Sequence, residues 1–293
     1  MPRATLDDLR IEFHRNILRE ILGLRRGKES RGYSNADTSS RGSKALAELV
    51  ARKLRAQTGQ EPCRRLPQEQ TVGTVFAKLT RDFLDQAFGR INHLRPGEWA
   101  LSTSQESGGI TKFYQYEHVA ELAGLLQNHP KLRATLGGDY LVTPDITISR
   151  SPVTDAEINK QGLFVSEADH VARLTPLRRA VNTTNILHAS VSCKWTIRSD
   201  RAQNTRTEAL NLLRHRKGKV PIVVAVTFEP LPTRIASVAL GTGDLDCTYH
   251  GALMELSEAV AETENEDQQD MLATLVKGRR LRDISDLPLD LAV

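Results

Sequence analysis

The feature that most constrains the fold of this chain is a short, almost continuously apolar run, VPIVVAVTFEP, at residues 220–230. A strand that is apolar at successive positions presents no face to water, so the run predicts a strand covered on both faces of its sheet. It is far too short to span a membrane. The chain must therefore surround this strand with other elements in a layered arrangement.

Two further segments are predicted as strands, residues 139–150 (DYLVTPDITISR) and 186–197 (ILHASVSCKWTI). Elsewhere the apolar residues recur at helical spacing. Helices are predicted over residues 5–24, 44–58, 71–91, 112–130, 249–262 and 266–276, with another beginning near Ser199 as its N-cap. The aromatic residues Phe113, Tyr114 and Tyr116 are expected in the core. We expect one α/β domain, residues 1–293, with a central mixed β-sheet flanked by helices.

Composition narrows the class of protein. With 39% hydrophobic residues, a chain of 293 residues can bury a sizeable core. The formal net charge of +4 permits a nucleic-acid partner without requiring one. Three cysteines cannot form a disulfide framework and suit a reducing cytosol. The start, MPRATLDDLRIEF, carries charge where a signal peptide needs an apolar core. We therefore expect a cytoplasmic protein without a membrane partner, and the absence of CxxC and HExxH spacing argues against zinc.

Residues 25–44, RRGKESRGYSNADTSSRGSK, are rich in Gly, Ser and Arg and almost free of apolar side chains. This composition predicts a mobile loop. Such a loop is either a solvated linker or an arm that becomes ordered on DNA, and composition alone leaves both readings open.

The strand at residues 186–197 has one polar face. With a period of two, Ser190, Ser192, Lys194 and Thr196 point one way, and the apolar residues between them point the other. An ammonium group in a mostly buried strand is costly unless anions lie beside it. The sequence therefore predicts acidic partners for Lys194.

Two carboxylates are candidates for that place. Asp145 follows Pro144 in a neighbouring predicted strand, and Glu208 lies about two turns into the following helix. Two carboxylates and a lysine at a sheet edge suit metal-assisted phosphodiester hydrolysis, because carboxylates bind Mg²⁺ and lysine stabilises charge on the phosphate. A core aspartate and an ion-paired lysine would also account for the pattern.

A dense block of charge, IRSDRAQNTRTEALNLLRHRKGK, follows the same strand. A solvated helix face explains such a block. A helix that begins at a polyanion and contacts it through Arg198, Asp200 and Arg201 explains it as well.

These motifs resemble those of a known superfamily. TPD at 143–145, SCK at 192–194 and Glu208 resemble the PD-(D/E)xK nucleases, in a variant where Ser192 takes the usual acidic place and Glu208 supplies the acid. SNAD, SCKWTIRSDRAQN, LNLLRHRKG, ALGTGDLDC and ISDLPLDLAV extend the resemblance nearly end to end. The chain closely resembles the CCGG-recognising type II restriction endonucleases.

The resemblance implies a restriction-endonuclease-like core that depends on Mg²⁺. It implies a homotetramer, a dimer of dimers, which cuts double-stranded DNA at a palindrome while bridging two copies of it. Asp145, Glu208 and the backbone carbonyl of Cys193 would ligate the metal, and Lys194 would be the catalytic lysine. The thiol of Cys193 would then be structural.

The resemblance also assigns the bases to be read. Arginine binds guanine O6 and N7, and aspartate accepts from cytosine N4. Arg198, Asp200 and Arg201 would read the inner CCGG. The outer G·C pair would be read by Arg234 together with Asp37 and Ser39 in the Gly/Ser-rich loop, and Gln70 would contact the minor groove. The implied target is GCCGGC, cut after the first G to leave a 5′ CCGG overhang.

One position departs from the family pattern. The family carries a glutamate near the active site on the helix around residue 77, where this chain has Ala77. That departure keeps open a DNA-binding protein that has lost catalysis. A repair or recombination nuclease with the same core but no palindrome specificity is a second alternative. Cleavage of a plasmid of known sequence, with and without Mg²⁺, separates the three.

Overall fold

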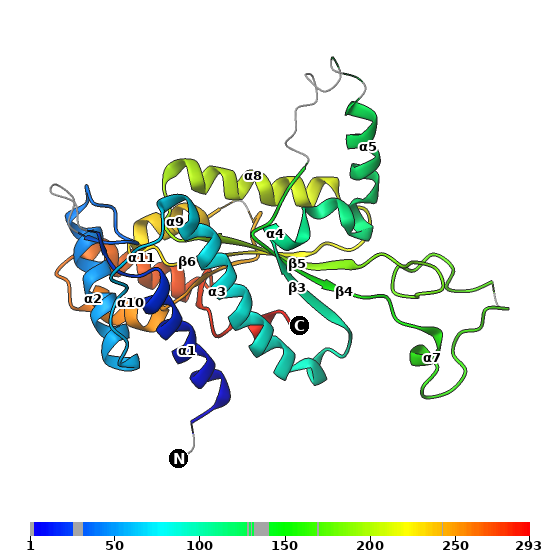
Figure 1. Ribbon diagram of the computed structural model, residues 1–293, viewed down its shortest axis with the longest axis horizontal. Helices are drawn as coiled ribbons and strands as arrows, with labels where there is room; N and C mark the ends of the chain where they lie inside the picture. Colours follow the sequence, from blue (N-terminus) through cyan, green and yellow to red (C-terminus); the bar gives the residue numbers. More distant parts are fainter. Residues whose placement is uncertain are drawn as a thin grey trace.

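A six-stranded mixed β-sheet runs through the centre of the computed structural model (Figure 1). The structure describes residues 3–25, 32–127, 129, 131, 141–168, 170–241 and 243–293, and of residues 199–202 the backbone alone. The sheet order follows the chain: β3 (Trp99–Thr103), β4 (Ile146–Arg150), β5 (Ile186–Lys194), β6 (Ile222–Thr227), β7 (Cys247–His250) and β8 (Leu281–Asp283). The first three strands are antiparallel, and β5 to β8 are parallel. A short hairpin joins β1 (Leu24–Arg25) to β2 (Gly32–Tyr33).

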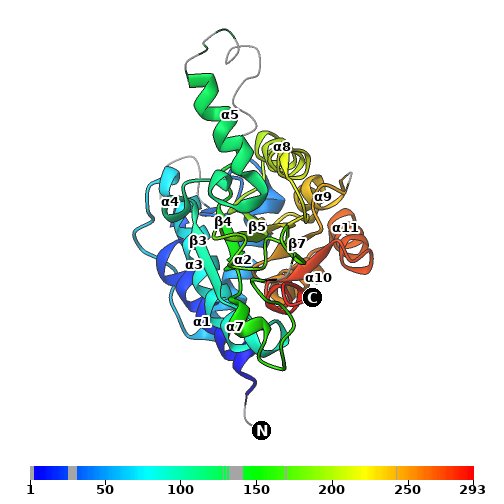
Figure 2. The ribbon, with the colours of Figure 1, turned by 90° about the vertical axis from the view of Figure 1, so that its right-hand side faces the viewer.

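Helices flank the sheet, so the predicted α/β class with a mixed sheet is confirmed (Figure 2). The longer helices are α1 (Thr5–Glu20), α2 (Arg41–Thr58), α3 (Glu69–Arg90), α5 (Glu117–Gln127), α8 (Ser199–His215), α9 (Pro232–Ala239), α10 (Leu253–Ala261) and α11 (Glu266–Lys277). Short helices are α4 (Ser104–Ser107), α7 (Asp155–Ile158) and α12 (Leu287–Asp290). Helix α3 lies on one face with α1 packed outside it, and α8 and α9 lie on the other.

The predicted alternation of buried and partly exposed residues is confirmed from Val191 onward, and the double burial of β6 is confirmed. Val191, Cys193 and Trp195 are buried on the α3 side, where the Trp195 ring lies 5.3 Å from the Phe76 ring and stacks on Phe228 at 5.1 Å. All positions of β6 after its first are buried. This aromatic cluster fixes the end of the strand that carries Lys194.

Several predicted boundaries were wrong. The helix expected over 112–130 begins at Glu117, because residues 110–116 form two 3₁₀ turns after Gly109, whose φ of +105° only glycine adopts readily. Phe113 and Tyr116 are buried as predicted, whereas Tyr114 is half-exposed. The strand expected from residue 139 begins at Ile146, and Pro130 and residues 139–140 lie outside the described part of the chain.

Two more boundary predictions fail for local reasons. Ser199 is not the N-cap of α8 but its first residue, and the cap is Arg198, which is still extended at φ −117° and ψ 164°. The helix expected from residue 249 begins at Leu253, because residues 247–250 pair with both neighbouring strands as β7.

The segment at residues 25–44, predicted as a mobile loop, is anchored where it is described. The Ser34 hydroxyl donates to the Ile21 carbonyl, and the Asn35 amide donates to the Phe228 carbonyl at 3.1 Å. Ser40 caps α2, which begins at Arg41. Residues 34–40 thus form turns and irregular chain held by buried hydrogen bonds, residues 32–33 and 41–44 belong to β2 and α2, and residues 26–31 lie outside the description.

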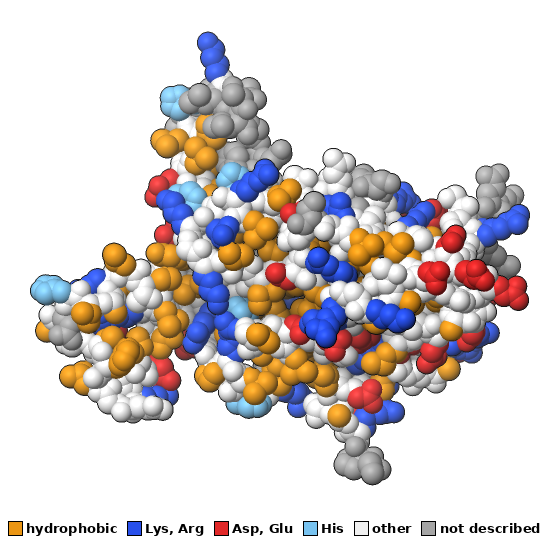
Figure 3. Space-filling model, turned by 180° about the vertical axis from the view of Figure 1, so that it is seen from behind, with side chains coloured by type: hydrophobic (Ala, Val, Ile, Leu, Met, Phe, Trp, Pro, Cys, Tyr) orange, Lys and Arg blue, Asp and Glu red, His pale blue; other side chains and the backbone are white. Residues whose placement is uncertain are grey.

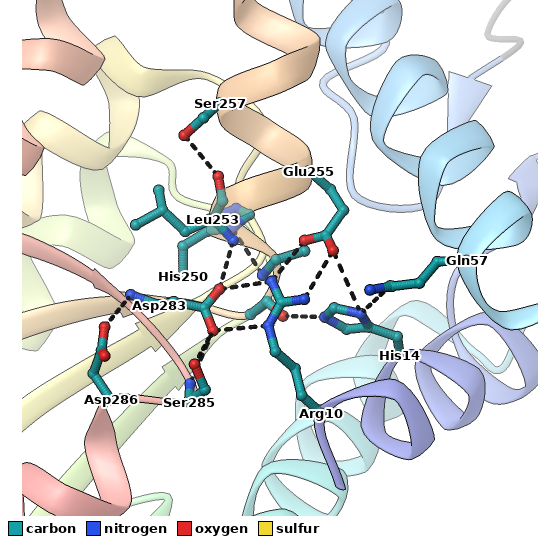
Figure 4. A network of polar contacts seen from close by, with 12 residues as sticks. Arg10, His14, Gln57, His250, Leu253, Glu255, Ser257, Asp283, Ser285 and Asp286 are labelled. Carbon is teal, nitrogen blue, oxygen red and sulfur yellow. Dashed lines mark hydrogen bonds and ion pairs between the residues drawn. The ribbon is translucent and has the colours of Figure 1, made fainter. Parts of the chain in front are cut away.

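A buried ionic network fastens α1 to the C-terminal part of the chain (Figure 4). Arg10 donates to both carboxylate oxygens of Glu255 at 2.8 and 2.7 Å and to both of Asp283 at 2.8 Å. Beside it His14 lies 2.9 Å from the Gln57 side-chain oxygen and 2.8 Å from the Gly251 carbonyl. Burial disfavours the Asp283 carboxylate, yet Arg10 outweighs it and lowers its pKa to about 2. The network ties α1, α2, the start of α10 and β8 to one another.

The connection between β4 and β5, residues 151–185, projects from the body as a lobe that carries α7 (Figure 1). Hydrophobic side chains gather on its surface (Figure 3). The most exposed of them are Leu163, Phe164, Val171 and Leu174. None of the helices in the described ranges is long and apolar enough to cross a membrane.

Candidate functional site

Asp145 and Lys194 meet where β4 begins and β5 ends. The backbone carbonyl of Asp145 accepts from Ser104 at 3.0 Å, which fixes the residue at the sheet edge. Its Oδ2 accepts from the Cys193 backbone N–H at 2.7 Å and from the Lys194 ammonium at 3.2 Å. The anion expected beside Lys194 is therefore Asp145.

Glu208 approaches the same place from α8. Thr205, Ala209 and Leu212 form the buried side of that helix, and Glu208 lies next to them at helical spacing. Burial raises the pKa of Glu208, Lys194 partly offsets this, and the Asp145 carboxylate adds to it. The structure thus brings two carboxylates and one ammonium into a single electrostatic cluster.

These groups line a pocket of about 420 Å³, which we call the carboxylate pocket. Its walls include Asp145, Cys193, Lys194, Arg198, Glu208 and, from the start of α3, Gln70. Ser192 lies on the same face of β5 as Lys194, but it does not line the carboxylate pocket. Its hydroxyl is buried and has no hydrogen-bond partner among the described residues.

A second pocket of about 750 Å³, which we call the arginine pocket, adjoins the first. It is lined by Asp37, Ser39, Arg198, Arg234 and also Gln203, Arg206, Thr233 and Ser237. Arg198 is common to both pockets, so the two form one continuous surface.

Asp37 and Arg234 form an ion pair inside the arginine pocket. The Ser39 hydroxyl and backbone N–H donate to the other oxygen of Asp37 at 2.7 and 2.9 Å. These hydrogen bonds and the Arg234 guanidinium hold the pKa of Asp37 well below its usual range. Three residues that the sequence analysis grouped together therefore lie in direct contact.

Not every predicted residue can be placed in this way. Asp200 and Arg201 lie in the first turn of α8, and their side chains are outside the described part of the structure. Ala77 is buried in α3, one turn beyond Gly73 in the wall of the carboxylate pocket.

Sequence reasoning missed Glu229. This carboxylate is fully buried behind the arginine pocket, where its Oε2 accepts from the Ile197 backbone N–H at 2.8 Å. Its signal in the sequence is a lone acid at the end of a continuously apolar strand, since such a strand end does not bury an unpartnered carboxylate.

The donor set of the carboxylate pocket fits a hard divalent cation. Carboxylate and carbonyl oxygens are what Mg²⁺ prefers. The N–H and C=O of a strand residue face the same edge, so the Cys193 carbonyl faces the side on which Asp145 lies. The described residues contain no cluster of three His, Cys, Asp or Glu side chains that could hold an ion by themselves. An ion here would be bound by two carboxylates, this carbonyl and water. Burial raises the pKa of the Cys193 thiol, so the side chain itself is a structural group.

A mixed sheet with flanking helices and this cluster at its edge fits the restriction-endonuclease-like core that the sequence predicts. A family model described as the NgoMIV restriction enzyme matches residues 13–293. The chain is 47% identical over 262 residues to the type II restriction enzyme NgoMIV of Neisseria gonorrhoeae, covering 89% of this chain and 90% of that protein. The chain therefore belongs to the NgoMIV restriction enzyme family and is a type II site-specific deoxyribonuclease.

A solved complex of the restriction endonuclease PspGI with substrate DNA matches only 35% of this chain and 38% of its own, at 18% identity and a TM-score of 0.23. The family assignment rests on the other two findings. Restriction enzymes of this kind generally need a divalent metal ion, and their substrate is DNA.

Proposed function

We propose that this restriction enzyme uses Mg²⁺ and cuts GCCGGC after the first G, leaving a 5′ CCGG overhang. The observation that carries the proposal is the cluster of Asp145, Lys194 and Glu208 beside a pocket lined by arginines. One group of side chains is suited to hydrolysis and the adjoining group to guanine and phosphate.

Asp145, Glu208 and the Cys193 carbonyl would hold the metal. When bound, Mg²⁺ supplies positive charge to the scissile phosphate and makes water a better nucleophile at neutral pH. The Cys193 N–H orients the Asp145 carboxylate. Lys194, fixed by the same carboxylate, directs its ammonium at charge that develops on the phosphate.

Ser192 has a smaller part. The hydroxyl takes the place of an acid in the motif but carries no charge toward a cation. Glu208 supplies that charge from α8, and its raised pKa fits a carboxylate that a cation would help to ionise.

The arginine pocket would read the recognition site. Arg234, aligned by Asp37 and Ser39, is proposed to read the outer G·C pair. Arg198 lies between the two pockets and is proposed to read the inner CCGG with Asp200 and Arg201 at the start of α8. Gln70, exposed near the start of α3, would reach the minor groove.

The proposed assembly is a homotetramer of single-domain chains, residues 1–293, with two DNA clefts. A palindrome is matched by a two-fold dimer. The exposed apolar side chains of the lobe at residues 151–185 provide surface that a larger assembly would bury. The free thiols Cys63, Cys193 and Cys247 suit the reducing cytoplasm.

Digestion of a plasmid of known sequence, with and without Mg²⁺, tests the function. Fragments that end at GCCGGC only when Mg²⁺ is present are expected. Specific binding without cleavage would favour a protein that has lost catalysis, for which Ala77 is the supporting observation. Fragments without a common sequence at their ends would favour a repair or recombination nuclease.

A further inference from the structure

Glu229 forms hydrogen bonds to the two segments that lead into α8 and α9, the helices proposed to read different base pairs. It follows β6, is fully buried, and uses both carboxylate oxygens as acceptors. Oε2 accepts from the Ile197 N–H at 2.8 Å, and Oε1 accepts from the Leu231 N–H at 3.2 Å. One side chain therefore connects two stretches of backbone that lie 34 positions apart in the sequence, as Ile197 and Leu231 are numbered.

Each of these stretches leads into a helix that contributes to the arginine pocket. Ile197 immediately precedes Arg198, the N-cap of α8, and the hydrogen bond from its N–H keeps the chain extended up to that cap. Leu231 is the N-cap of α9, and Arg234 lies in the first turn of that helix. The carboxylate thus fixes the starting points of the two helices proposed to read inner and outer base pairs.

The same turn is tied to the catalytic strand. The Glu229 N–H donates to the Thr227 hydroxyl at 3.1 Å, and this hydroxyl donates to the Lys194 carbonyl at 2.8 Å. The neighbouring Phe228 carbonyl accepts from Asn35, two residues before Asp37. Residues 227–229 therefore touch the catalytic strand and every described segment that carries a proposed reading residue of the arginine pocket.

Burying this carboxylate has a cost that packing does not explain. Glu229 forms no ion pair with any residue that the structure describes, and an apolar side chain would fill the space without desolvating a charge. What the carboxylate contributes is two acceptors in a fixed relative position. A misplacement of about 1 Å that a distant substitution causes in the reacting groups can cost on the order of a hundredfold in rate.

We propose that Glu229 is a positioning residue, which holds the starts of α8 and α9 in register with Lys194 and thereby sets sequence discrimination. The inference rests on the proposed function, because it takes these helices as the parts that read DNA. Glu229 contacts neither DNA nor metal in this proposal, and it acts only through the backbone of Ile197 and Leu231.

The test compares cleavage of the preferred hexamer with cleavage of hexamers changed at one inner or one outer pair, under single-turnover conditions. The variants are Glu229→Gln, which keeps the shape but turns an amide toward one of the N–H donors, and Glu229→Asp, which is too short to reach both. The control is Glu255→Gln, a buried acid in the Arg10 network that touches neither pocket. Circular dichroism checks that each variant is folded.

For both Glu229 variants we expect discrimination to fall about tenfold or more at inner and outer pairs alike, a larger change than any fall in the rate at the preferred site. Glu255→Gln should discriminate like the wild type. Unchanged discrimination in either folded Glu229 variant overturns the proposal, and so does an equal loss in the control. Failure of both variants to fold also overturns it, because the residue would then be structural.

The same experiment tests the proposed target sequence independently of the role of Glu229. If the wild type prefers a hexamer other than GCCGGC, the proposed target is wrong. Discrimination relative to the hexamer that is preferred still measures the effect of Glu229.

Discussion

The Lys194 ammonium lies 3.2 Å from Oδ2 of Asp145, although the two residues are 49 positions apart in the chain. The antiparallel register brings them together, because Ile146 pairs with Val191 at one end of the β4–β5 ladder. Asp145, which precedes Ile146, and Lys194, which follows Val191 by three residues, both lie just beyond that end. The contact between these two candidate active-site residues thus depends on sheet pairing.

Replacing either member of this pair should stop chemistry and spare recognition. We expect Asp145→Ala and Lys194→Ala to lower single-turnover cleavage by at least about a hundredfold, since they remove a metal ligand and a charge at the phosphate. Glu208→Ala should be similarly impaired and Ser192→Ala milder. Gel-shift titration in Ca²⁺ checks that binding to the site is retained; near-normal cleavage by either of the first two variants would refute the assignment.

The ion pair between Asp37 and Arg234 should govern the outer base pair. Arg234→Ala is expected to cost about 1–3 kcal/mol of discrimination there and to shift preference from GCCGGC toward NCCGGN. Asp37→Asn should have a smaller effect in the same direction, because it leaves the guanidinium unaligned. A profile of cleaved hexamers measures both, and Arg198→Ala, expected to alter an inner pair instead, is the matched comparison. Relaxation only at inner pairs in Arg234→Ala would contradict the proposal.

The proposed homotetramer should affect the rates at which plasmids with one and two sites are cut. If one tetramer engages two sites together, a plasmid with two GCCGGC sites is cut faster than a plasmid with one. A short duplex that carries the site should accelerate cleavage of the single-site plasmid when added in trans. Equal rates on both plasmids, with a monomer or dimer by light scattering at the working concentration, would exclude this assembly.

The neighbours in the candidate site were predictable mainly because TPD, SCK and Glu208 resemble the motifs of a known nuclease superfamily. The alternation around Lys194 predicted an acidic partner, and Asp145 and Glu208 were the two candidates. The short strand β7 was not predictable, since CTYH has too few positions for a period of two to stand out from the helix that follows it. Its place comes from pairing with β6 and β8.

Contacts between distant segments are the other part that sequence does not reveal. The sequence does not show that Glu229 accepts from Ile197, 32 positions away, or that Arg10 pairs with Asp283, 273 positions away. The anchoring of residues 34–40 was not predictable for the same reason, since Asn35 donates to the Phe228 carbonyl, which lies 193 positions away in the sequence.

The Arg10 network should contribute strongly to stability. Arg10→Ala leaves Glu255 and Asp283 buried without their cation, and we expect a loss of about 3–5 kcal/mol in the free energy of unfolding. Urea unfolding followed by tryptophan fluorescence measures it. Arg52→Ala, which removes an exposed ion pair with Glu262, is the control and should cost less than about 1 kcal/mol. Similar losses in the two variants would show that the buried network contributes no more to the free energy of unfolding than an exposed ion pair does.

Glu229 should make stability depend on pH. Burial raises its pKa from an ordinary 4.5 to about 7. Because the folded state keeps the proton longer than the unfolded chain, this contribution to stability is complete below pH 4.5 and is lost as pH rises through 7. Relative to Glu229→Gln, the wild type should lose on the order of 3 kcal/mol between pH 4.5 and 8, measured by urea unfolding across that range. A difference between the two proteins that is constant over this range would show that the carboxyl does not titrate there.

The hydrogen bonds from Arg10 to Asp283 span 273 residues. Synthesis at about 5–20 residues per second puts tens of seconds between the emergence of these two side chains from the ribosome. Until β8 has left the exit tunnel, the first helix of the nascent chain lacks half of its anionic anchor. The contacts that β8 makes with α1 can therefore form only near the end of translation, and in a chain that ends before Asp283 the buried Arg10 guanidinium keeps Glu255 as its one remaining partner of the two.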